Sequence, residues 1–308
     1  MPPARSEAPR QNRGASRSRA SLTGSERAEE RRDGPGAGRR PTVMRTLRLT
    51  IAYEGTDFHG WQYQPSLPTV QGLVMSAAGR VLGAPVKVTG ASRTDAGVHA
   101  LRQVASITTA SAMAPGALAR ALNALLPPAI RVLGAWEAAP GFDARRSAWG
   151  KRYAYVIDRG VPADPFGRRY AWHIAQALDE GAMAEGLRCV RGRHDFSAFC
   201  AAAGRGRTPT CTVRATRVVS RKRWLVIAIS ADSFLHHMVR NVVGSLVEVG
   251  RGAAPPAWMS ELIASRDRTR AGPTAPAQGL ALVRVLYGAG PPPASAGRPC
   301  VRGDGWAG

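Results

Sequence analysis

The chain has 308 residues, of which 44% are hydrophobic and 21% are charged, and its formal net charge is +22. This length suits two domains of ordinary size or one large one. No apolar run approaches the roughly 20 residues that cross a bilayer, so we expect no membrane association. The positive charge favours a polyanionic partner, although a composition rich in Arg, Ala, Gly and Pro offers a second explanation of it.

The cysteines argue against a metal or disulfide framework. Four of them lie far apart without a C-x-x-C pair, and they are Cys189, Cys200, Cys211 and Cys300. Neither a zinc site nor a dense set of disulfides is indicated by this spacing. We therefore expect free thiols, as in the reducing cytoplasm.

Both ends of the chain are predicted to be tails. Residues 1–43 are polar and cannot bury enough apolar surface to offset chain entropy, so a disordered basic tail is expected there. They hold ten Arg and five acidic residues, which leaves +17 of the net charge in the rest of the chain. The tail has no apolar signal-peptide core, and its acidic residues count against a transit peptide. Residues 288–308, rich in Gly and Pro, are expected to form a second loose tail.

Residues 44–145 read as one α/β repeat. Alternating apolar residues predict a strand over 47–53, and apolar residues spaced by three and four predict a helix over 70–82. Short strands are predicted near 85–90 and 102–108, a helix over 118–125 that ends before Pro127, and a strand near 130–137. The order β-α-β-β-α-β is that of the ferredoxin-like fold.

Residues 146–287 repeat that order. The prediction has a strand around 153–157, a helix around 178–191, strands over 212–219 and 223–230, a long helix from Phe234 to about 249, a shorter helix near 256–265 and a last strand over 280–287. The fold class is therefore α+β, with two tandem ferredoxin-like repeats that meet near 140–150. Two open sheets of this kind can join edge to edge, which the sequence alone does not establish.

The segment Gly90–Ala100, G-A-S-R-T-D-A-G-V-H-A, is the most unusual part of the sequence. Small residues there carry Ser, Arg, Asp and His beyond the end of a strand, as functional loops do. The plain alternative is a polar turn, because Asp favours turns and Gly97 permits positive φ. The density of hydrogen-bonding side chains among residues too small to form a core favours a functional role.

Two further segments have residues that a site could use. In K-R-Y-A-Y (Lys151–Tyr155), Tyr153 and Tyr155 share one strand face, either as core or as a platform on which a base stacks. In F-L-H-H-M-V-R-N (Phe234–Asn241), adjacent histidines on a helix point about 100° apart, so we expect no metal pair. Arg240 interrupts a largely apolar helix and either reaches solvent or pairs with a carboxylate.

Two basic segments are either solvated surface or phosphate contacts. One is Phe142-Asp143-Ala144-Arg145-Arg146, between the repeats, and the other is the Gly-punctuated run from Gly204 to Pro209, which contains Arg205 and Arg207. Because +17 of the charge lies outside the N-terminal tail, phosphate contacts are the preferred interpretation.

These segments together resemble the tRNA pseudouridine synthase A (TruA) family. The resemblance rests on G-A-S-R-T-D-A-G-V-H-A, on A-Y-E-G-T-D-F-H-G-W-Q (Ala52–Gln62), on K-R-Y-A-Y, on F-L-H-H-M-V-R-N-V-V-G-S-L-V-E-V-G (Phe234–Gly250) and on the ending A-P-A-Q-G-L-A-L-V-R-V-L-Y (Ala275–Tyr287). It spans about residues 44–287 in order and spacing. Cys211 departs from the polar or basic residue expected there, which puts one RNA contact in doubt.

The resemblance implies the pseudouridine synthase fold and a base-flipping, Asp-dependent and metal-independent isomerisation of uridine to pseudouridine in the anticodon stem-loop of tRNA, at positions 38, 39 and 40. It implies that Asp95 is the catalytic carboxylate, Arg240 its basic partner and Tyr153 the active-site tyrosine. Arg93 would occupy the place of the flipped base, and RNA contacts would come from Phe142, Arg145, Arg146, Arg205 and Arg207. A cytoplasmic homodimer without a cofactor is implied as well.

Whether Asp95 attacks the base, attacks the sugar C1′ or removes a sugar proton stays open. Two rival functions would require other residues. A non-catalytic RNA-binding protein on the same scaffold would have replaced Asp95, Tyr153 or Arg240, and all three are present. A hydrolase that uses Asp95 with the two histidines, with or without a metal, would need a second carboxylate or a spaced ligand set, which the sequence does not offer.

Overall fold

The computed structural model describes residues 43–201 and 208–288, so the two predicted tails lie outside the described residues apart from Val43 and Gly288. The first half contains β1 (Arg45–Tyr53), α1 (Val70–Leu82), β2 (Val88–Gly90), β3 (His99–Thr109), α2 (Pro115–Leu125) and β4 (Ile130–Glu137). Thr69 begins α1 by accepting a hydrogen bond from the Gly72 N–H, and Gly83 ends it in the left-handed conformation.

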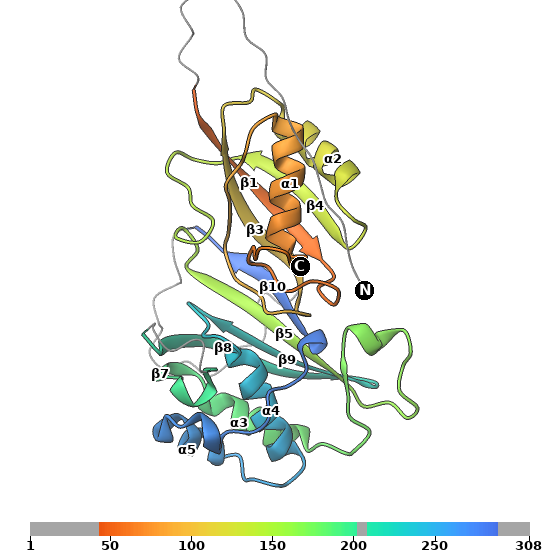
Figure 1. Cartoon of the computed structure of the whole chain (residues 1–308). Helices are drawn as coiled ribbons and strands as arrows, with labels where there is room; N and C mark the ends of the chain where they lie inside the picture. Colours follow the sequence, from red (N-terminus) through yellow and green to blue (C-terminus); the bar gives the residue numbers. More distant parts are fainter. Residues whose placement is uncertain (1–42, 202–207, 289–308) are drawn as a thin grey trace, which may run out of the picture. The chain divides into compact units, whose positions relative to one another are not determined.

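The second half contains β5 (Gly150–Asp158), β6 (Trp172–His173), α3 (Glu180–Cys189), β7 (Gly192–Asp195), β8 (Thr210–Arg221), β9 (Trp224–Ala231), α4 (Met238–Gly250), α5 (Trp258–Ser265) and β10 (Leu280–Leu286). Asp179 begins α3 through a hydrogen bond from the Ala182 N–H to its carboxylate. Figure 1 shows the elements of the two halves along one continuous sheet. None of the helices in the described ranges is long and apolar enough to cross a membrane.

The sheet order is β4-β1-β3-β10-β5-β9-β8-β7, with β2 beside β3 and β6 beside β5. In the first half, the four strands of the β-α-β-β-α-β unit lie in the order fourth, first, third, second. The second half repeats this order with β10, β5, β9 and β8. The α+β fold class with two ferredoxin-like repeats is therefore confirmed.

The repeats join edge to edge through β3 and β10, which pair in parallel at His99–Ala281 and Ala100–Leu282. Across this join the register places Tyr53, Ala100, Leu282 and Tyr153 in one row. Side chains directly opposite each other point to the same face of a sheet. Tyr53 of the first repeat and Tyr153 of the second therefore project from the same face, and both are buried.

That face holds the hydrophobic core. The buried alternation of β1 comprises Leu47, Leu49, Ile51 and Tyr53, and that of β5 comprises Tyr153, Tyr155 and Ile157. Helix α2 packs on β4 and on α1, while α3 packs on β8 and on α4. These contacts bury one continuous set of apolar side chains, on which the loops at the join rest.

Two predicted elements begin at other residues in the structure, and two short strands were not predicted. Strand β3 begins at His99 rather than near residue 102, because its first residues pair with β10. Strands β6 and β7 were not predicted, since two and four residues are too few for a period to show. The long helix begins at Met238 and not at Phe234. The predicted boundary between residues 145 and 146 falls in the connection from β4 to β5 and stays a prediction.

Candidate active site

The segment between β2 and β3, here called the Asp95 loop (residues 91–98), rests on the residues that follow β1. The Trp61 N–H donates to the Thr94 carbonyl (3.1 Å), and the Gly97 N–H donates to the Phe58 carbonyl (3.2 Å). Gly60 has φ +81°, and a Cβ on it would lie 2.5 Å from the Thr94 carbonyl oxygen. The A-Y-E-G-T-D-F-H-G-W-Q segment is thus the support of the Asp95 loop.

Two tyrosines from different repeats bind alternate residues of this loop. The Tyr53 hydroxyl lies 2.7 Å from Thr94 Oγ1, and the Tyr153 hydroxyl lies 2.9 Å from Ser92 Oγ. The buried Gln103 adds two hydrogen bonds to the main chain of Ser92. With Ser92 and Thr94 bound on the inner side, Arg93 between them is exposed. Within S-R-T-D, Ser92 and Thr94 therefore hold the loop in place, while Arg93 between them faces solvent.

Arg240 reaches Asp95 from the first turn of α4. Its Nη1 lies 3.5 Å from Asp95 Oδ2, and its Nε donates to the Ala275 carbonyl (2.7 Å). The Arg240 side chain is 15% exposed and that of Asp95 is 21% exposed. The sequence left open whether Arg240 reaches solvent or pairs with a carboxylate. In the structure it is largely buried and pairs with the carboxylate of Asp95.

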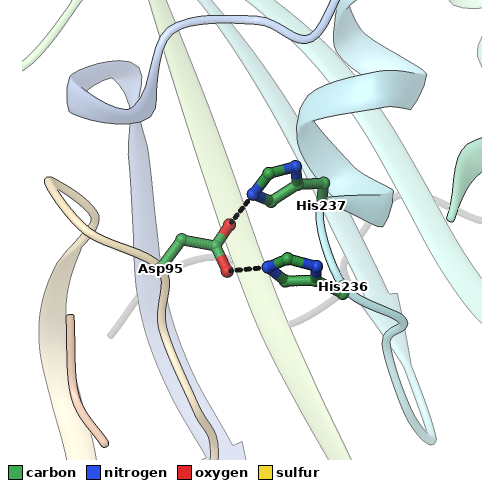
Figure 2. Close-up of side chains that lie close together, drawn as sticks. All are labelled: Asp95, His236 and His237. Carbon is green, nitrogen blue, oxygen red and sulfur yellow. Dashed lines mark ion pairs between the residues drawn. The ribbon is translucent and has the colours of Figure 1, made fainter. Parts of the chain in front are cut away.

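Two histidines also face Asp95, and here the sequence-based geometry was wrong. His236 Nε2 lies 3.6 Å from Asp95 Oδ1, and His237 Nε2 lies 3.6 Å from Oδ2. Figure 2 shows one imidazole ring directed at each carboxylate oxygen. The rings do not diverge by 100°, because residues 234–237 precede the helix and His237 is left-handed with φ 62°. Their centroids are 4.0 Å apart.

Burial lowers the pKa of His237, and the neighbouring Asp95 carboxylate opposes that effect. The neutral ring, which burial favours, offers a lone pair on one ring nitrogen. Asp95, His236 and His237 are also the one group of three metal-ligating side chains that the described ranges bring together.

Tyr153 is buried among groups that keep its hydroxyl protonated. Burial raises its pKa well above the usual range, with a smaller contribution from Asp95, while the hydrogen bond with Ser92 acts in the opposite direction. Its ring meets that of Phe234 edge to face, with centroids 4.9 Å apart at 78°. The phenol is therefore a neutral hydrogen-bonding group in a fixed orientation.

Asp95 lines a cleft of about 1160 Å³. This exceeds the roughly 300–1,000 Å³ that pockets for small molecules usually have. The other charged residues of its lining are cations: Lys87, Arg93, Arg145 and Lys151. Tyr153, Phe234 and Trp61 supply aromatic surface in the same cleft. A single carboxylate among cations and aromatic rings suits an anionic ligand with a planar ring.

The remaining predicted contacts are spread more widely. Arg145 and Arg146 are exposed at a turn in which Asp143 accepts hydrogen bonds from both of their N–H groups (2.9 and 2.7 Å). Phe142 is partly buried against Tyr287, with ring centroids 5.4 Å apart, so its ring serves packing. Arg205 and Arg207 lie outside the described residues. Cys211, the departure from the family pattern, is buried.

The sequence did not predict the roles of Ser92, Phe234, His236 and His237 in this arrangement. All four stand in the quoted segments, so their types were visible, but their partners come from other elements. Ser92 meets a strand of the second repeat, and the histidines meet a loop of the first.

Comparison with known proteins identifies the family. The model of a family described as tRNA pseudouridine synthase matches residues 49–144 and 188–288. The chain belongs to this family. The tRNA pseudouridine synthase A of Myxococcus xanthus is 44% identical over 250 residues, covering 81% of this chain and 94% of its own. That of Moorella thermoacetica is 44% identical over 246 residues, covering 79% of this chain and 100% of its own.

The two matched stretches of the family model contain the Asp95 loop and Arg240 respectively, while Tyr153 lies between them. A crystal structure of an archaeal Nop10–Cbf5 complex covers 65% of this chain and 43% of that chain, with a TM-score of 0.31 and 12% identity.

Proposed function

We propose that this chain isomerises uridines 38, 39 and 40 in the anticodon stem-loop of tRNA, with Asp95 as its catalytic carboxylate. Membership of the tRNA pseudouridine synthase family makes the protein a tRNA-modifying isomerase. One observation supports the site assignment above the others: Asp95 is the only carboxylate lining a cleft whose other charged residues are cations, within the described ranges. A non-catalytic RNA-binding role is not favoured.

The reaction breaks the bond from C1′ to N1 of the base and forms one from C1′ to C5. C5 loses its proton and N1 gains one, so the reaction is redox-neutral. An ionised Asp95 can act on the base, act on C1′ or remove a sugar proton, and each of these needs an oxygen lone pair free of bound protons. Arg240 places a positive charge beside Oδ2, while His236 lies beside Oδ1.

Tyr153 is proposed to form one wall of the pocket that holds the flipped uracil. Its orientation is determined by Ser92 and Phe234, so the base would meet a surface that does not rearrange. Because its phenol is neutral, Tyr153 would contribute a hydrogen bond to a polar atom of the base, or help to move the C5 proton, without carrying a charge. Flipping a base out of its stack costs a few kcal/mol. We propose that exposed Arg93, two residues from Asp95, offsets this cost by occupying the vacated position.

The cations Lys87, Arg145 and Lys151 around the cleft are proposed to contact phosphates of the stem-loop. Arg146, Arg205 and Arg207 would extend these contacts, and Phe142 would support the turn that presents Arg145 and Arg146. Binding should then weaken steeply with salt, because each neutralised phosphate releases counterions. We further propose a cytoplasmic homodimer with tRNA across both subunits, as the resemblance to the TruA family implies.

The test is release of tritium from tRNA labelled at uridine C5, with the full chain. Asp95→Asn should abolish release while tRNA binding, followed by gel retardation, stays within about twofold, since the change is nearly isosteric. Glu261→Gln, which removes an exposed carboxylate from α5, is the matched control and should retain full release. Undiminished release in Asp95→Asn would overturn the catalytic assignment.

The positions are tested separately with transcripts in which each of uridines 38, 39 and 40 is replaced by cytidine. Release should fall for each transcript that loses a target and vanish when all three are replaced. Persistent release from the triple replacement would show that the substrate assignment is wrong while the chemistry stands.

A further inference from the structure

Asp95, His236 and His237 offer the donor set of a transition-metal site. One carboxylate oxygen and two imidazole nitrogens all lie within 4.8 Å of one another, and two of the separations are 3.6 Å. Bonds from Zn²⁺ of about 2.0–2.2 Å in a tetrahedron put neighbouring ligand atoms roughly 3.3–3.5 Å apart. The separation of His236 Nε2 from Asp95 Oδ1 is thus already close to that around a bound ion. His237 lies nearer Oδ2, so ring rotations would have to bring its nitrogen into range of an ion held by Oδ1.

From this geometry we propose that the three residues bind one divalent transition-metal ion of the zinc class, and that the bound ion blocks the site. Two imidazoles and one carboxylate suit Zn²⁺, Co²⁺ and Cu²⁺. Mg²⁺ demands oxygen ligands in an octahedron and is a poor fit to two nitrogens. The fourth position of a tetrahedral ion would face the cleft, which all three residues line.

The backbone before α4 directs both histidine rings toward Asp95, as a shared metal ion would require. Phe234 packs on Tyr153, and the left-handed turn at His237 precedes α4, so both rings face the same carboxylate (Figure 2). Arg240 opposes the ion, because its guanidinium lies 3.5 Å from Asp95 Oδ2. The ion would therefore bind through Oδ1, and the repulsion from Arg240 would weaken its affinity without removing a ligand.

Blocking follows from the chemistry that the proposed function assigns to Asp95, on which this second part rests. A carboxylate oxygen that donates its lone pair to a metal is no longer available to a base or a sugar. Metal binding and uridine isomerisation would then be mutually exclusive. Zn²⁺ should inhibit reversibly and should compete with tRNA for the free enzyme.

Binding is tested on the full chain without RNA, so that it is independent of activity. Calorimetry with Zn²⁺ should give one site per chain, and Co²⁺ should give the visible absorption of a tetrahedral complex. His236→Gln and His237→Asn should each weaken binding by at least about tenfold, since even outer-shell changes commonly cost about 10–100-fold. Asn is chosen at position 237 because it tolerates positive φ. His173→Gln, at an exposed histidine on β6, is the matched control.

Arg240→Ala separates this site from adventitious binding at surface histidines. Loss of its charge should tighten Zn²⁺ binding, whereas a site elsewhere would not respond. The absence of a site with one Zn²⁺ per chain, or binding that survives both histidine variants, would overturn the proposal. Thermal unfolding with and without Zn²⁺ supplies a second measurement, since an ion that binds only the folded state raises the Tm.

Inhibition is then measured by tritium release at constant Mg²⁺ with increasing Zn²⁺, and reversed with a chelator that prefers Zn²⁺. If Zn²⁺ inhibits tritium release by the wild type but does not change the release by the His236→Gln variant, the result supports blocking at this site. Equal inhibition of both overturns it. The two proposals fail in different ways. Zn²⁺ binding by the wild type together with an active Asp95→Asn variant would contradict the catalytic role, and the blocking that rests on it, but not the metal site. An inactive Asp95→Asn variant together with a wild type that binds no Zn²⁺ would contradict only the metal site.

Discussion

The hydroxyl of Tyr153 lies 2.9 Å from that of Ser92, so a side chain of the second repeat binds the loop that contains Asp95 in the first. Tyr53 forms the corresponding bond to Thr94 within the first repeat. The two tyrosines share a row of the sheet across the β3–β10 join. The position of the Asp95 loop therefore depends on the join between the repeats as much as on its own strands.

Ser92→Ala should lower kcat roughly tenfold, the equivalent of about 1.4 kcal/mol, because the loop loses its bond to the second repeat. Tyr155→Phe is the control. It deletes a hydroxyl that donates to the Pro276 carbonyl, a similar bond that does not reach the loop. Tyr155→Phe should reduce stability by about 1 kcal/mol while kcat is retained. Steady-state kinetics and urea unfolding measure both, and equal losses of kcat would argue against a specific role for Ser92.

Gly60→Ala should reduce both stability and activity. The residue has φ +81°, and the added Cβ would stand 2.5 Å from the Thr94 carbonyl, so the Asp95 loop must move. Gly83→Ala is matched in backbone strain, with φ +69°, but its Cβ would meet nothing within 4 Å. Left-handed backbone costs an L-residue roughly 1–2 kcal/mol in either variant. Only Gly60→Ala should lower kcat, and a similar fall in Gly83→Ala would refute the steric explanation.

Arg240→Ala should lower kcat by roughly 10²–10³ with little change in KM, which is the size of effect seen when a charge-stabilising group is removed from an active site. Arg240→Lys should be intermediate, because an ammonium cannot bind Asp95 and the Ala275 carbonyl in the same planar arrangement. Arg251→Ala, at the other end of the helix in an exposed pair with Glu248, is the control. Full activity of Arg240→Ala would remove the arginine from the mechanism.

Asp158 should make the fold sensitive to acid. Burial opposes its ionisation, but donation from Arg223 and from the N–H groups of Asp164 and Gly160 is stronger and lowers its pKa to about 2. Because the folded pKa is below that of the unfolded chain, the stabilisation is complete above about pH 4 and is lost as the pH falls toward 2. Its size is on the order of 2 kcal/mol.

Urea unfolding between pH 7 and pH 2 checks this expectation. Arg223→Gln removes the bidentate partner of Asp158, so the variant should be less stable at pH 7 and should show a weaker dependence on acid. Asp158 does not line the cleft, so kcat at pH 7 should be retained. An acid dependence identical to that of the wild type would contradict the assignment.

Much of the fold was predictable because burial in this protein follows simple periods. Leu47, Leu49 and Ile51 alternate on β1, and Leu118 and Leu122 recur on α2, so local pattern and final environment agree. The start of β3 was not predictable, since His99 and Ala100 become strand by pairing with β10, which is far away in the sequence. Short β6 and β7 depend on their neighbours in the same way.

The candidate site divides similarly. The resemblance to the family marks Asp95, Tyr153 and Arg240. In the structure Asp95 and Tyr153 line one cleft and Arg240 lies 3.5 Å from Asp95, while the roles of all three stay predictions. The sequence could not predict the arrangement of the histidines, because His237 adopts a positive φ, which only a few per cent of non-Gly residues do and which no local pattern signals here. The apolar spacing predicts a helix that includes Leu235, and Leu235 is indeed buried. The spacing therefore does not reveal that α4 begins only at Met238.

The β3–β10 join forms late in the synthesis of the chain. Strand β10 is the last strand that the structure describes, yet it lies in the middle of the sheet, between strands that are synthesised much earlier. Until residues 280–286 leave the ribosome, β3 and β5 have unpaired edges, and the Asp95 loop lacks its place opposite Tyr153. The sheet on which the candidate site rests is therefore complete only after nearly all of the described residues have been synthesised.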